Sequence, residues 1–477
     1  MDQKYIVAIE LAGTQIRGAL STVHNPTGMM PIPNIEAIAA TESDDCVQYG
    51  RVQNLINAAK CTSDVLRSLQ NESMIADGKI NRVYVGIGGR SLGSEKVSAS
   101  IVLPSEMVIS QDVLRNLFME ATKMKSQNKN VLKVLPRKFY VDNNAMPNPV
   151  GALGRHLKGD FTLVTCNPVN QRNMDLVLGD RMNLKVEKYI VTPLALADML
   201  LGEEEKQRGC MLVDLGAQTT TLSVYKDRAL QYIAVLPIGS HNITRDIAMG
   251  MNLTMEKAEN AKLSIGDAQA QPNGSDETSR TNNYVVARAY ELVINIIANI
   301  EYAGYTQADL PAGFILAGRG SRLTNFDNLL SAQSKMKVRH ASMPSNVNFA
   351  FNTTSRNVDD YLSLVALVMR VSKSPNFISC VDFPHKEETP AEPVIPAEPE
   401  IRQAPVLEKE IQIEPEDEGA DDNNWQKDDE TPDPAPKNKE EEKPAPPKNK
   451  KRSFLDRMKE KMTNILSNDG LDDDTQL

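Results

Sequence analysis

Two segments of the chain place an acidic residue at the end of an apolar run, directly before a turn of small residues. Glu10 ends the run 5–10 and precedes the turn 12–14, while Asp214 follows the run 210–213 and precedes the turn 215–220. Small residues after a strand let backbone N–H groups approach a phosphate, and the acidic side chain can hold the accompanying Mg²⁺ directly or through water. A single turn of this kind is also what plain turn geometry would produce. Two of them predict a clamp for a phosphate-bearing ligand.

A third glycine-bearing turn, 318–321, follows the short apolar run 313–317. The order and spacing of the three turns carry more weight than any one of them. Because the second half of the chain repeats the acidic turn of the first half, the sequence predicts a duplicated pair of α/β lobes that face a shared cleft.

The elements that must position these turns alternate between strand and helix. Near the first turn, runs 5–10 and 18–23 predict a hairpin, followed by a helix over 54–69 and a strand over 82–89. Before the second turn we expect strands over 161–166 and 174–178, then a helix over 192–201 that Thr192 and Pro193 open. The runs 210–215 and 222–225 predict the second hairpin.

The pattern changes between residues 91 and 160. This stretch predicts a strand near 99–103, a helix opened by Ser110 with Asp112 in its first turn, and strands over 131–141. We interpret it as an inserted α+β unit.

The three turns resemble the phosphate-1, phosphate-2 and adenosine motifs of the actin-like ATPase superfamily. Within that superfamily, segments 192–197 and 237–250 are similar to the FtsA family of bacterial cell-division proteins, as are 112–114, 134–142 and 149–154 of the inserted unit. The resemblance covers about residues 5–375. It implies a two-lobed actin-like ATPase fold of the α/β class, with an inserted α+β subdomain.

The resemblance also implies subdomain boundaries. They are subdomain 1A over 1–90, the inserted subdomain 1C over 91–160, 1A again over 161–192, subdomain 2A over 193–240, subdomain 2B over 241–310, and returns to 2A over 311–345 and to 1A over 346–384.

Carried over motif by motif, the resemblance implies ATP and Mg²⁺ as cofactors. Gly13 and Thr14 would meet the terminal phosphates, Asp214 would hold Mg²⁺ through water, and Glu259 with Lys262 would contact ribose and base. An ordinary exposed i, i+3 helix pair is the alternative for Glu259 and Lys262. The implied nucleotide-binding residues are Glu10, Gly13, Thr14, Gln15, Asp214, Gly216, Thr219, Thr220, Gly239, Glu259, Lys262, Gly318, Gly320 and Ser321.

Four positions depart from the family pattern. Glu10 replaces an Asp, and Ala12, Gln218 and Arg319 each replace a Gly. A side chain where the backbone must approach a ligand takes up space, although Arg319 would also bring a donor and a positive charge near a nucleotide. We therefore expect nucleotide binding with slow or absent hydrolysis, so that the chain is at most a weak ATPase.

Composition excludes several other classes of protein. A net charge of −10 argues against nucleic acid as a partner, and five scattered cysteines without a CxxC pair fit a reducing compartment better than a disulfide framework. The first residues lack a signal peptide, and no window holds about twenty apolar residues. We expect a cytoplasmic protein with no membrane-spanning segment.

The C-terminal residues differ sharply from the rest. Residues 385–450 are rich in Pro, Glu, Asp and Lys, which predicts a disordered linker whose ends lie roughly 45 Å apart. Residues 451–467 predict a basic amphipathic helix that binds an anionic membrane surface, although docking on a protein is the alternative. An acidic tail, 468–477, follows. The apolar face of the helix consists of Phe454, Leu455, Met458, Met462, Ile465 and Leu466.

Together these features favour a membrane adaptor. The FtsA resemblance implies an actin-like polymer on the cytoplasmic face of the bacterial inner membrane, at the division site. There it would bind the C-terminal peptide of the tubulin-like protein FtsZ and recruit later division proteins. Arg288 is a candidate contact for that peptide, and a plain helix-surface arginine is its alternative. Two other functions stay open: a catalytic ATPase or small-molecule kinase of the superfamily, and an actin-like adaptor of pilus assembly.

Overall fold

The computed structural model describes residues 4–24, 31–43, 45–73, 75, 77–351, 353 and 357–383. These residues belong to one compact unit, Met1–His385. The predicted linker 385–450, membrane helix 451–467 with its six apolar side chains, and acidic tail 468–477 lie outside the described residues.

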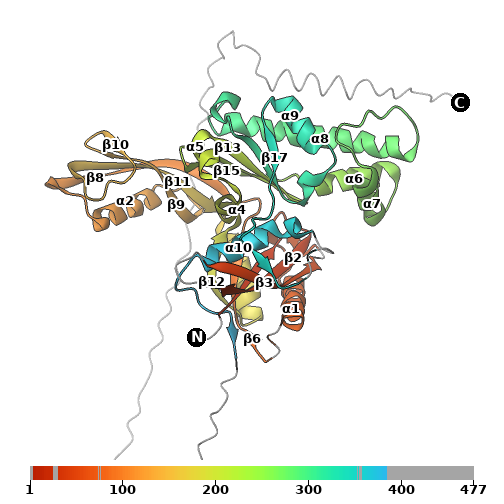
Figure 1. The fold of residues 1–477 in the computed structure, drawn as a ribbon, viewed down its shortest axis with the longest axis horizontal. Helices are drawn as coiled ribbons and strands as arrows, with labels where there is room; N and C mark the ends of the chain where they lie inside the picture. Colours follow the sequence, from red (N-terminus) through yellow and green to blue (C-terminus); the bar gives the residue numbers. More distant parts are fainter. Residues whose placement is uncertain are drawn as a thin grey trace, which may run out of the picture. The chain divides into compact units, whose positions relative to one another are not determined.

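Two sheets of the same design form the body of the unit (Figure 1). In each, a central strand has an antiparallel hairpin on one side and two parallel strands on the other, as the predicted duplication requires. The first sheet contains, in spatial order, β12 (Lys185–Val191), β7 (Arg82–Ile87), β1 (Tyr5–Leu11), β2 (Gln15–His24), β3 (Ile32–Glu42) and β18 (Asn348–Phe349). The second contains β15 (Ala229–Leu236), β14 (Thr220–Lys226), β13 (Cys210–Leu215), β16 (Gly313–Ala317) and β17 (Val338–His340).

The central strand of the first sheet is buried on both of its faces. Ile6, Val7, Ala8 and Ile9 are completely buried, which explains why this strand is a continuous apolar run instead of an alternating one. Helix α1 (Leu55–Glu72), capped by Asn54, packs on β2 and β3. Helices α10 (Leu362–Ser372) and α4 (Thr192–Leu200) pack on each other, and α10 also contacts β1. We call this sheet with its helices the first lobe.

The central strand of the second sheet divides its side chains between two cores. Met211 and Val213 belong to a core with the helices that follow, whereas Cys210 and Leu212 join the core of the first lobe. The helices of the second core are α6 (Ser240–Met251), α7 (Met255–Ile265), α8 (Glu277–Tyr302) and α9 (Phe326–Ser334). We call the second sheet with these helices the second lobe.

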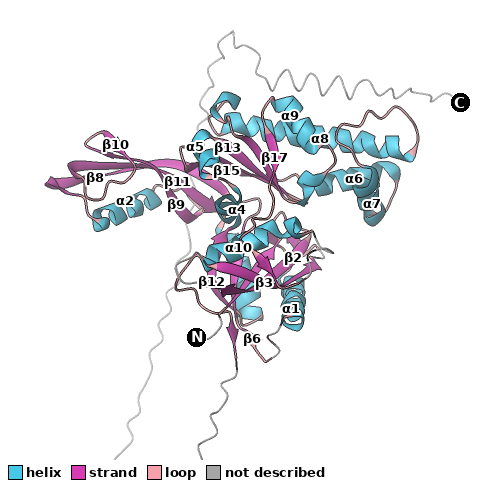
Figure 2. Cartoon of the chain, in the orientation of Figure 1, coloured by secondary structure: helices cyan, strands magenta, loops and turns pink. Residues whose placement is uncertain are grey.

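The inserted unit is a sheet with one helix against it (Figure 2). Ser110 caps its helix as predicted, its Oγ accepting a hydrogen bond from the Val113 N–H at 3.3 Å. Leu117 and Phe161 fill a small separate core between helix and sheet. The elements are β8 (Gly93–Val108), α2 (Gln111–Lys123), β9 (Asn130–Val141), β10 (Asn144–Met146) and β11 (Leu153–Cys166), with the sheet order β10-β9-β11-β8.

Strand β11 belongs to two cores. Leu157 and Phe161 lie in the core of the inserted unit, whereas Val164 and Cys166 lie in the core of the first lobe. The predicted strand 161–166 is therefore the second half of one longer strand, and its partner β8 extends well beyond the predicted 99–103. The insertion joins the body through paired strands and not through loops.

The predicted strand 174–178 is wrong. Those residues finish helix α3 (Pro168–Asp175) and enter a π-helical turn, Leu176–Arg181. Asn167 caps the helix and Pro168 occupies its first turn, which are both helix-start signals. Met174, Val177 and Leu178 are buried at the i, i+3, i+4 spacing of a helix face, so the apolar run has a helical period.

The remaining elements are short. They are β4 (Val47–Gln48), β5 (Arg51–Val52), β6 (Lys79–Ile80), α5 (Glu203–Arg208), the 3₁₀ turns Gln307–Asp309, Arg319–Arg322 and Val358–Tyr361, and β19 (Val381–Asp382). All five cysteines are buried, and none of them forms a disulfide bond. Among the described helices, none has the length and apolar character needed to cross a membrane.

Candidate functional site

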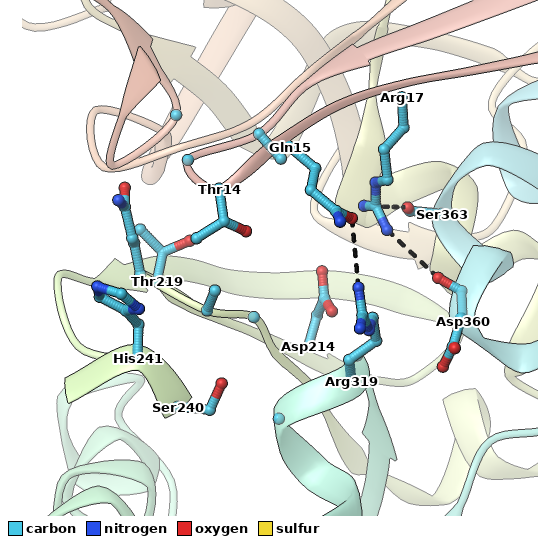
Figure 3. Close-up of a pocket in the computed structure, with 18 of the residues that line it drawn as sticks. Thr14, Gln15, Arg17, Asp214, Thr219, Ser240, His241, Arg319, Asp360 and Ser363 are labelled. Carbon is cyan, nitrogen blue, oxygen red and sulfur yellow. Dashed lines mark hydrogen bonds between the residues drawn. The ribbon is translucent and has the colours of Figure 1, made fainter. Parts of the chain in front are cut away.

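Loops from both lobes line one cavity of about 920 Å³ (Figure 3). The first loop (residues 10–15) follows β1, the second loop (residues 214–219) follows β13, and the third turn (residues 318–322) follows β16. Ligands bind at the carboxyl ends of strands in open α/β sheets, and all three segments leave such ends. The three turns singled out in the sequence therefore do meet.

Glu10 of the first loop is already paired. Its Oε2 accepts hydrogen bonds from Arg17 Nη2 at 2.6 Å and from Ser363 Oγ at 2.7 Å. Arg17 stands directly opposite Glu10 in the β1–β2 hairpin, and both side chains are about 15% exposed. Arg17 also donates to the Asp360 carbonyl at 3.3 Å. The Glu10 carboxylate thus ties the hairpin to the residues around α10.

The backbone of the first loop remains open to the cavity. Within the described part of the chain, the N–H groups of Gly13 and Thr14 donate to no protein acceptor. The same holds for Ala217 and Gln218 of the second loop. Because unpaired backbone donors are costly away from water, a row of four of them at one cavity is suited to an anion.

Asp214 of the second loop differs from Glu10 because its carboxylate accepts no hydrogen bond from any described residue. Burial and the nearby Glu10 carboxylate raise its pKa to about 6, although Arg17 opposes the shift. Gly318 of the third turn packs against it: a Cβ there would lie 2.5 Å from Asp214 Oδ1, and the φ of Gly318 is +82°. Only glycine suits that position.

Gln218 stands where the family pattern has a glycine, and its side chain occupies space that a glycine would leave empty. Its Oε1 accepts a hydrogen bond from the Tyr49 N–H at 2.7 Å, and its side chain lies over Gly13. A Cβ at residue 13 would come within 2.1 Å of that oxygen. The side chain therefore joins the second loop to the first.

Arg319 and Arg322 of the third turn also reach toward the first lobe. Arg319 Nη1 donates to Gln15 Oε1 at 3.2 Å, and Arg322 Nη1 pairs with Asp360 Oδ1 at 2.5 Å. Figure 3 shows the Arg319 guanidinium between Gln15 and Asp214.

Glu259 and Lys262 form an i, i+3 helix pair in which the lysine is buried, whereas the Glu259 side chain is 41% exposed. Lys262 is 6% exposed, and its Nζ donates to Glu259 Oε2 at 2.8 Å and to Thr244 Oγ1 at 2.9 Å. Burial opposes ionisation of Glu259, but hydrogen bonds from Lys262 and Thr244 lower its pKa overall. The pair lies on the cavity wall with its charge fixed.

Three residues of the predicted site lie behind the loops and not on the cavity wall. Thr220 Oγ1 donates to the Ile238 carbonyl at 2.8 Å, and Ser321 Oγ donates to the Gly318 carbonyl at 2.7 Å. Gly239 packs so tightly that a Cβ would lie 2.4 Å from the Ala217 carbonyl oxygen. These residues hold the loops in shape.

The sequence did not single out other residues of the wall. Arg17, Asp360 and Ser363 line the cavity, and the buried Thr192 Oγ1 lies on it without a hydrogen-bond partner in the described structure. The similarity of segment 192–197 to FtsA was the one sequence signal near any of them.

Arg288 on α8 is held by two ion pairs. It contacts Asp246 of α6 at 2.7 Å through Nε, and Glu291 through Nη1. Its side chain is 23% exposed. A partner that used this arginine would therefore compete with both carboxylates.

The charges and donors of the wall fit a magnesium nucleotide. Eight acidic residues line the cavity against four Arg and Lys side chains, so an anionic ligand fits best with a cation beside it. The described residues include no cluster of three or more metal-ligating side chains. Mg²⁺ does not require one, since it commonly binds one or two carboxylates, phosphates and water. The open carboxylate of Asp214 suits that role.

Comparisons with known proteins agree with this fold. The model for "Cell division protein FtsA" matches residues 211–359, and that for the "SHS2 domain inserted in FTSA" matches residues 89–165. The chain is 28% identical over 397 residues to cell division protein FtsA of Porphyromonas gingivalis, which covers 79% of each protein. It is 27% identical over 279 residues to FtsA of Escherichia coli K12, covering 58% of this chain and 64% of that protein.

A solved structure supports the fold alone. The PilM–PilN type IV pilus biogenesis complex superposes with a TM-score of 0.56 at 14% identity, over 78% of this chain and 99% of that one. The two family models and the relatives point to a particular family, whereas this structural match concerns the fold alone. With its actin-like α/β fold, and with the SHS2 model matching its inserted unit, the chain is similar to the FtsA family of cell division proteins.

Proposed function

We propose that this chain binds MgATP in the cavity, assembles with copies of itself on the cytoplasmic face of the bacterial inner membrane, and anchors the FtsZ ring there. The observation that carries the nucleotide part is that four residues of the cavity wall have backbone N–H groups without an acceptor among the described residues. Similarity to the FtsA family supports the role in division, and the sequence of residues 451–467 supports the membrane part.

In this proposal each part of the wall has one task. The amides of Gly13, Thr14, Ala217 and Gln218 bind phosphate oxygens, and Asp214 holds a water of the Mg²⁺ shell. Glu259 and Lys262, fixed by Thr244, contact ribose and base. Mg²⁺, when bound, neutralises phosphate charge beside an acidic wall. In this proposal the subdomains have the bounds that the family resemblance implies, and the cavity lies between 1A and 2A–2B.

Hydrolysis is slow or absent in this proposal. A general base must be free to accept a proton from water, and the Glu10 carboxylate already accepts hydrogen bonds from Arg17 and Ser363. Gln218 also fills space over Gly13. We therefore expect the nucleotide to act as a structural ligand. Steady phosphate release from ATP at ordinary enzyme rates would contradict this part.

Membrane binding depends on assembly. Burying half of each of six apolar side chains gives about 1 kcal/mol per residue, and folding the helix opposes that gain. One copy then binds weakly, and a polymer binds firmly through avidity. The FtsZ peptide docks on the second lobe, where Arg288 is a candidate contact, and later division proteins join the assembled complex.

The test is co-sedimentation of FtsZ with anionic liposomes, using either the full-length chain or a truncation that ends at Pro447. Recruitment by the full-length chain alone supports both the anchor and the adaptor. If the full-length chain pellets without FtsZ, the partner assignment is wrong. If neither form pellets, the membrane anchor is wrong.

A further inference from the structure

Three of the four cationic side chains on the cavity wall have a carboxylate partner. Arg17 pairs with Glu10, Lys262 pairs with Glu259, and Arg322 pairs with Asp360. Arg319 is the exception among the described residues, since its recorded partner is the neutral amide oxygen of Gln15. Its guanidinium therefore lines the cavity without an ion-pair partner among the described residues.

The position of Arg319 sets it beside the place where phosphate would lie. It begins the 3₁₀ turn after β16 in the second lobe, whereas Gln15 follows the open amides of Gly13 and Thr14 in the first. The contact joins residues 304 apart in the chain and spans the cavity. Figure 3 shows the guanidinium directed from the third turn toward the first loop.

We propose that Arg319 is a phosphate ligand of the bound nucleotide, and that it exchanges Gln15 for phosphate when the nucleotide enters. This inference rests on the proposed nucleotide binding. A guanidinium forms shorter and stronger hydrogen bonds to phosphate than to a neutral amide, and it can form two in parallel. The exchange therefore favours the nucleotide-bound form and removes one contact between the lobes.

The assignment also accounts for the missing glycine. Gly318 and Gly320 supply the tight backbone on either side, where a Cβ would meet Leu215 and Asp214. Residue 319 lies between them, exposed to the cavity, so a long side chain fits there without displacing the turn. The substitution thus adds a ligand while the neighbouring glycines keep the backbone shape.

The test measures affinity for MgADP and for adenosine by titration calorimetry, using the full-length chain and three variants. R319Q keeps the size and removes the charge, R319K keeps the charge, and R115A removes a surface arginine of α2 that pairs with Asp112. We expect R319Q to weaken MgADP binding about 10- to 100-fold, the usual effect of a charged hydrogen bond. R319K should bind with an affinity between those of R319Q and the parent, because it keeps the charge but loses the pair of parallel hydrogen bonds. R115A should match the parent chain, and adenosine should bind R319Q and the parent alike.

The outcomes separate the two proposals. If the parent chain binds no nucleotide, the proposed function and this inference both fail. If the parent binds MgADP and R319Q binds it equally well, the inference alone fails. An equal loss of adenosine and MgADP binding in R319Q would overturn the phosphate assignment, and thermal unfolding of each variant shows whether it is folded.

Discussion

The two acidic residues at the ends of the central strands occupy equivalent places and are in opposite states. Glu10 in β1 and Asp214 in β13 are each the next-to-last residue of the strand, beside an antiparallel hairpin partner. Glu10 is bound by Arg17 and Ser363, whereas Asp214 has no protein donor in the described structure. At two equivalent positions of a duplicated fold, the Glu10 carboxylate is therefore paired within the protein, whereas the Asp214 carboxylate is available to a ligand.

The difference arises from the strand opposite each acid. Arg17 faces Glu10 across the first hairpin, whereas Thr221 faces Asp214 across the second. The residue opposite on the neighbouring strand thus determines which carboxylate has a cationic partner in the ligand-free protein.

The largest expected effect comes from removing Arg17. The Arg17→Ala variant leaves the Glu10 carboxylate partly buried without its cation, and loss of one partner of a buried pair costs about 3–5 kcal/mol. Urea unfolding should show this loss of stability. The double variant R17A/E10A should regain part of it, because no unpaired charge remains. Equal stability of R17A and the parent would show that Glu10 is not held as described.

The next effect concerns Asp214 and the metal. The Asp214→Asn variant should bind MgADP about 10- to 100-fold more weakly, since it loses the anion that holds the metal's water. Titration with and without Mg²⁺ checks the cause. The loss should largely disappear when Mg²⁺ is absent, and a loss that persists there would mean that Asp214 acts on the loop and not on the metal.

A pH series sharpens the contrast between the two acids. The folded pKa of Asp214, about 6, lies above its ordinary value of 3.8, so the native state binds more protons between pH 4 and 6. This group's contribution to stability therefore falls as the pH rises through that window. Without nucleotide, D214N should be about 2–3 kcal/mol more stable than the parent at pH 7 and nearly equal to it near pH 4. A constant difference across the series would contradict the raised pKa.

The smallest effect tests the contact between the two loops. The Gln218→Gly variant removes the hydrogen bond to the Tyr49 N–H and adds backbone freedom, which together cost about 1–2 kcal/mol. Thermal unfolding of the nucleotide-free protein measures the cost. The Gln218→Asn variant keeps the amide on a shorter side chain and serves as the control for side-chain polarity. If Q218G and the parent unfold alike, the cross-loop contact is not stabilising.

Much of the site could be predicted because its signals are local. An apolar strand, an acid and small residues stand next to each other at Glu10 and at Asp214, and the helix caps at Asn54 and Ser110 depend on a few neighbouring residues. The strand predicted at 174–178 failed because an apolar run was given the wrong period.

The partners of those residues could not be predicted. Ser363 meets Glu10 from 353 positions away, and Arg319 meets Gln15 from 304. Such contacts exist only once α10 packs on β1 and the two lobes face one cavity. Sequence patterns located the chemical groups, and tertiary packing determined which of them remain free to bind.

Strand β11 gives the inserted unit a mechanical property. The strand has 14 residues, or about 46 Å of extended backbone, and it is anchored in two cores. From His156 to Thr165 its ladder with β8 runs without a break in register. A tension along these strands loads many hydrogen bonds in shear at the same time, and no loop lies between to absorb it. We therefore expect a pull along β11 to be transmitted from the core of the insertion to the core of the first lobe.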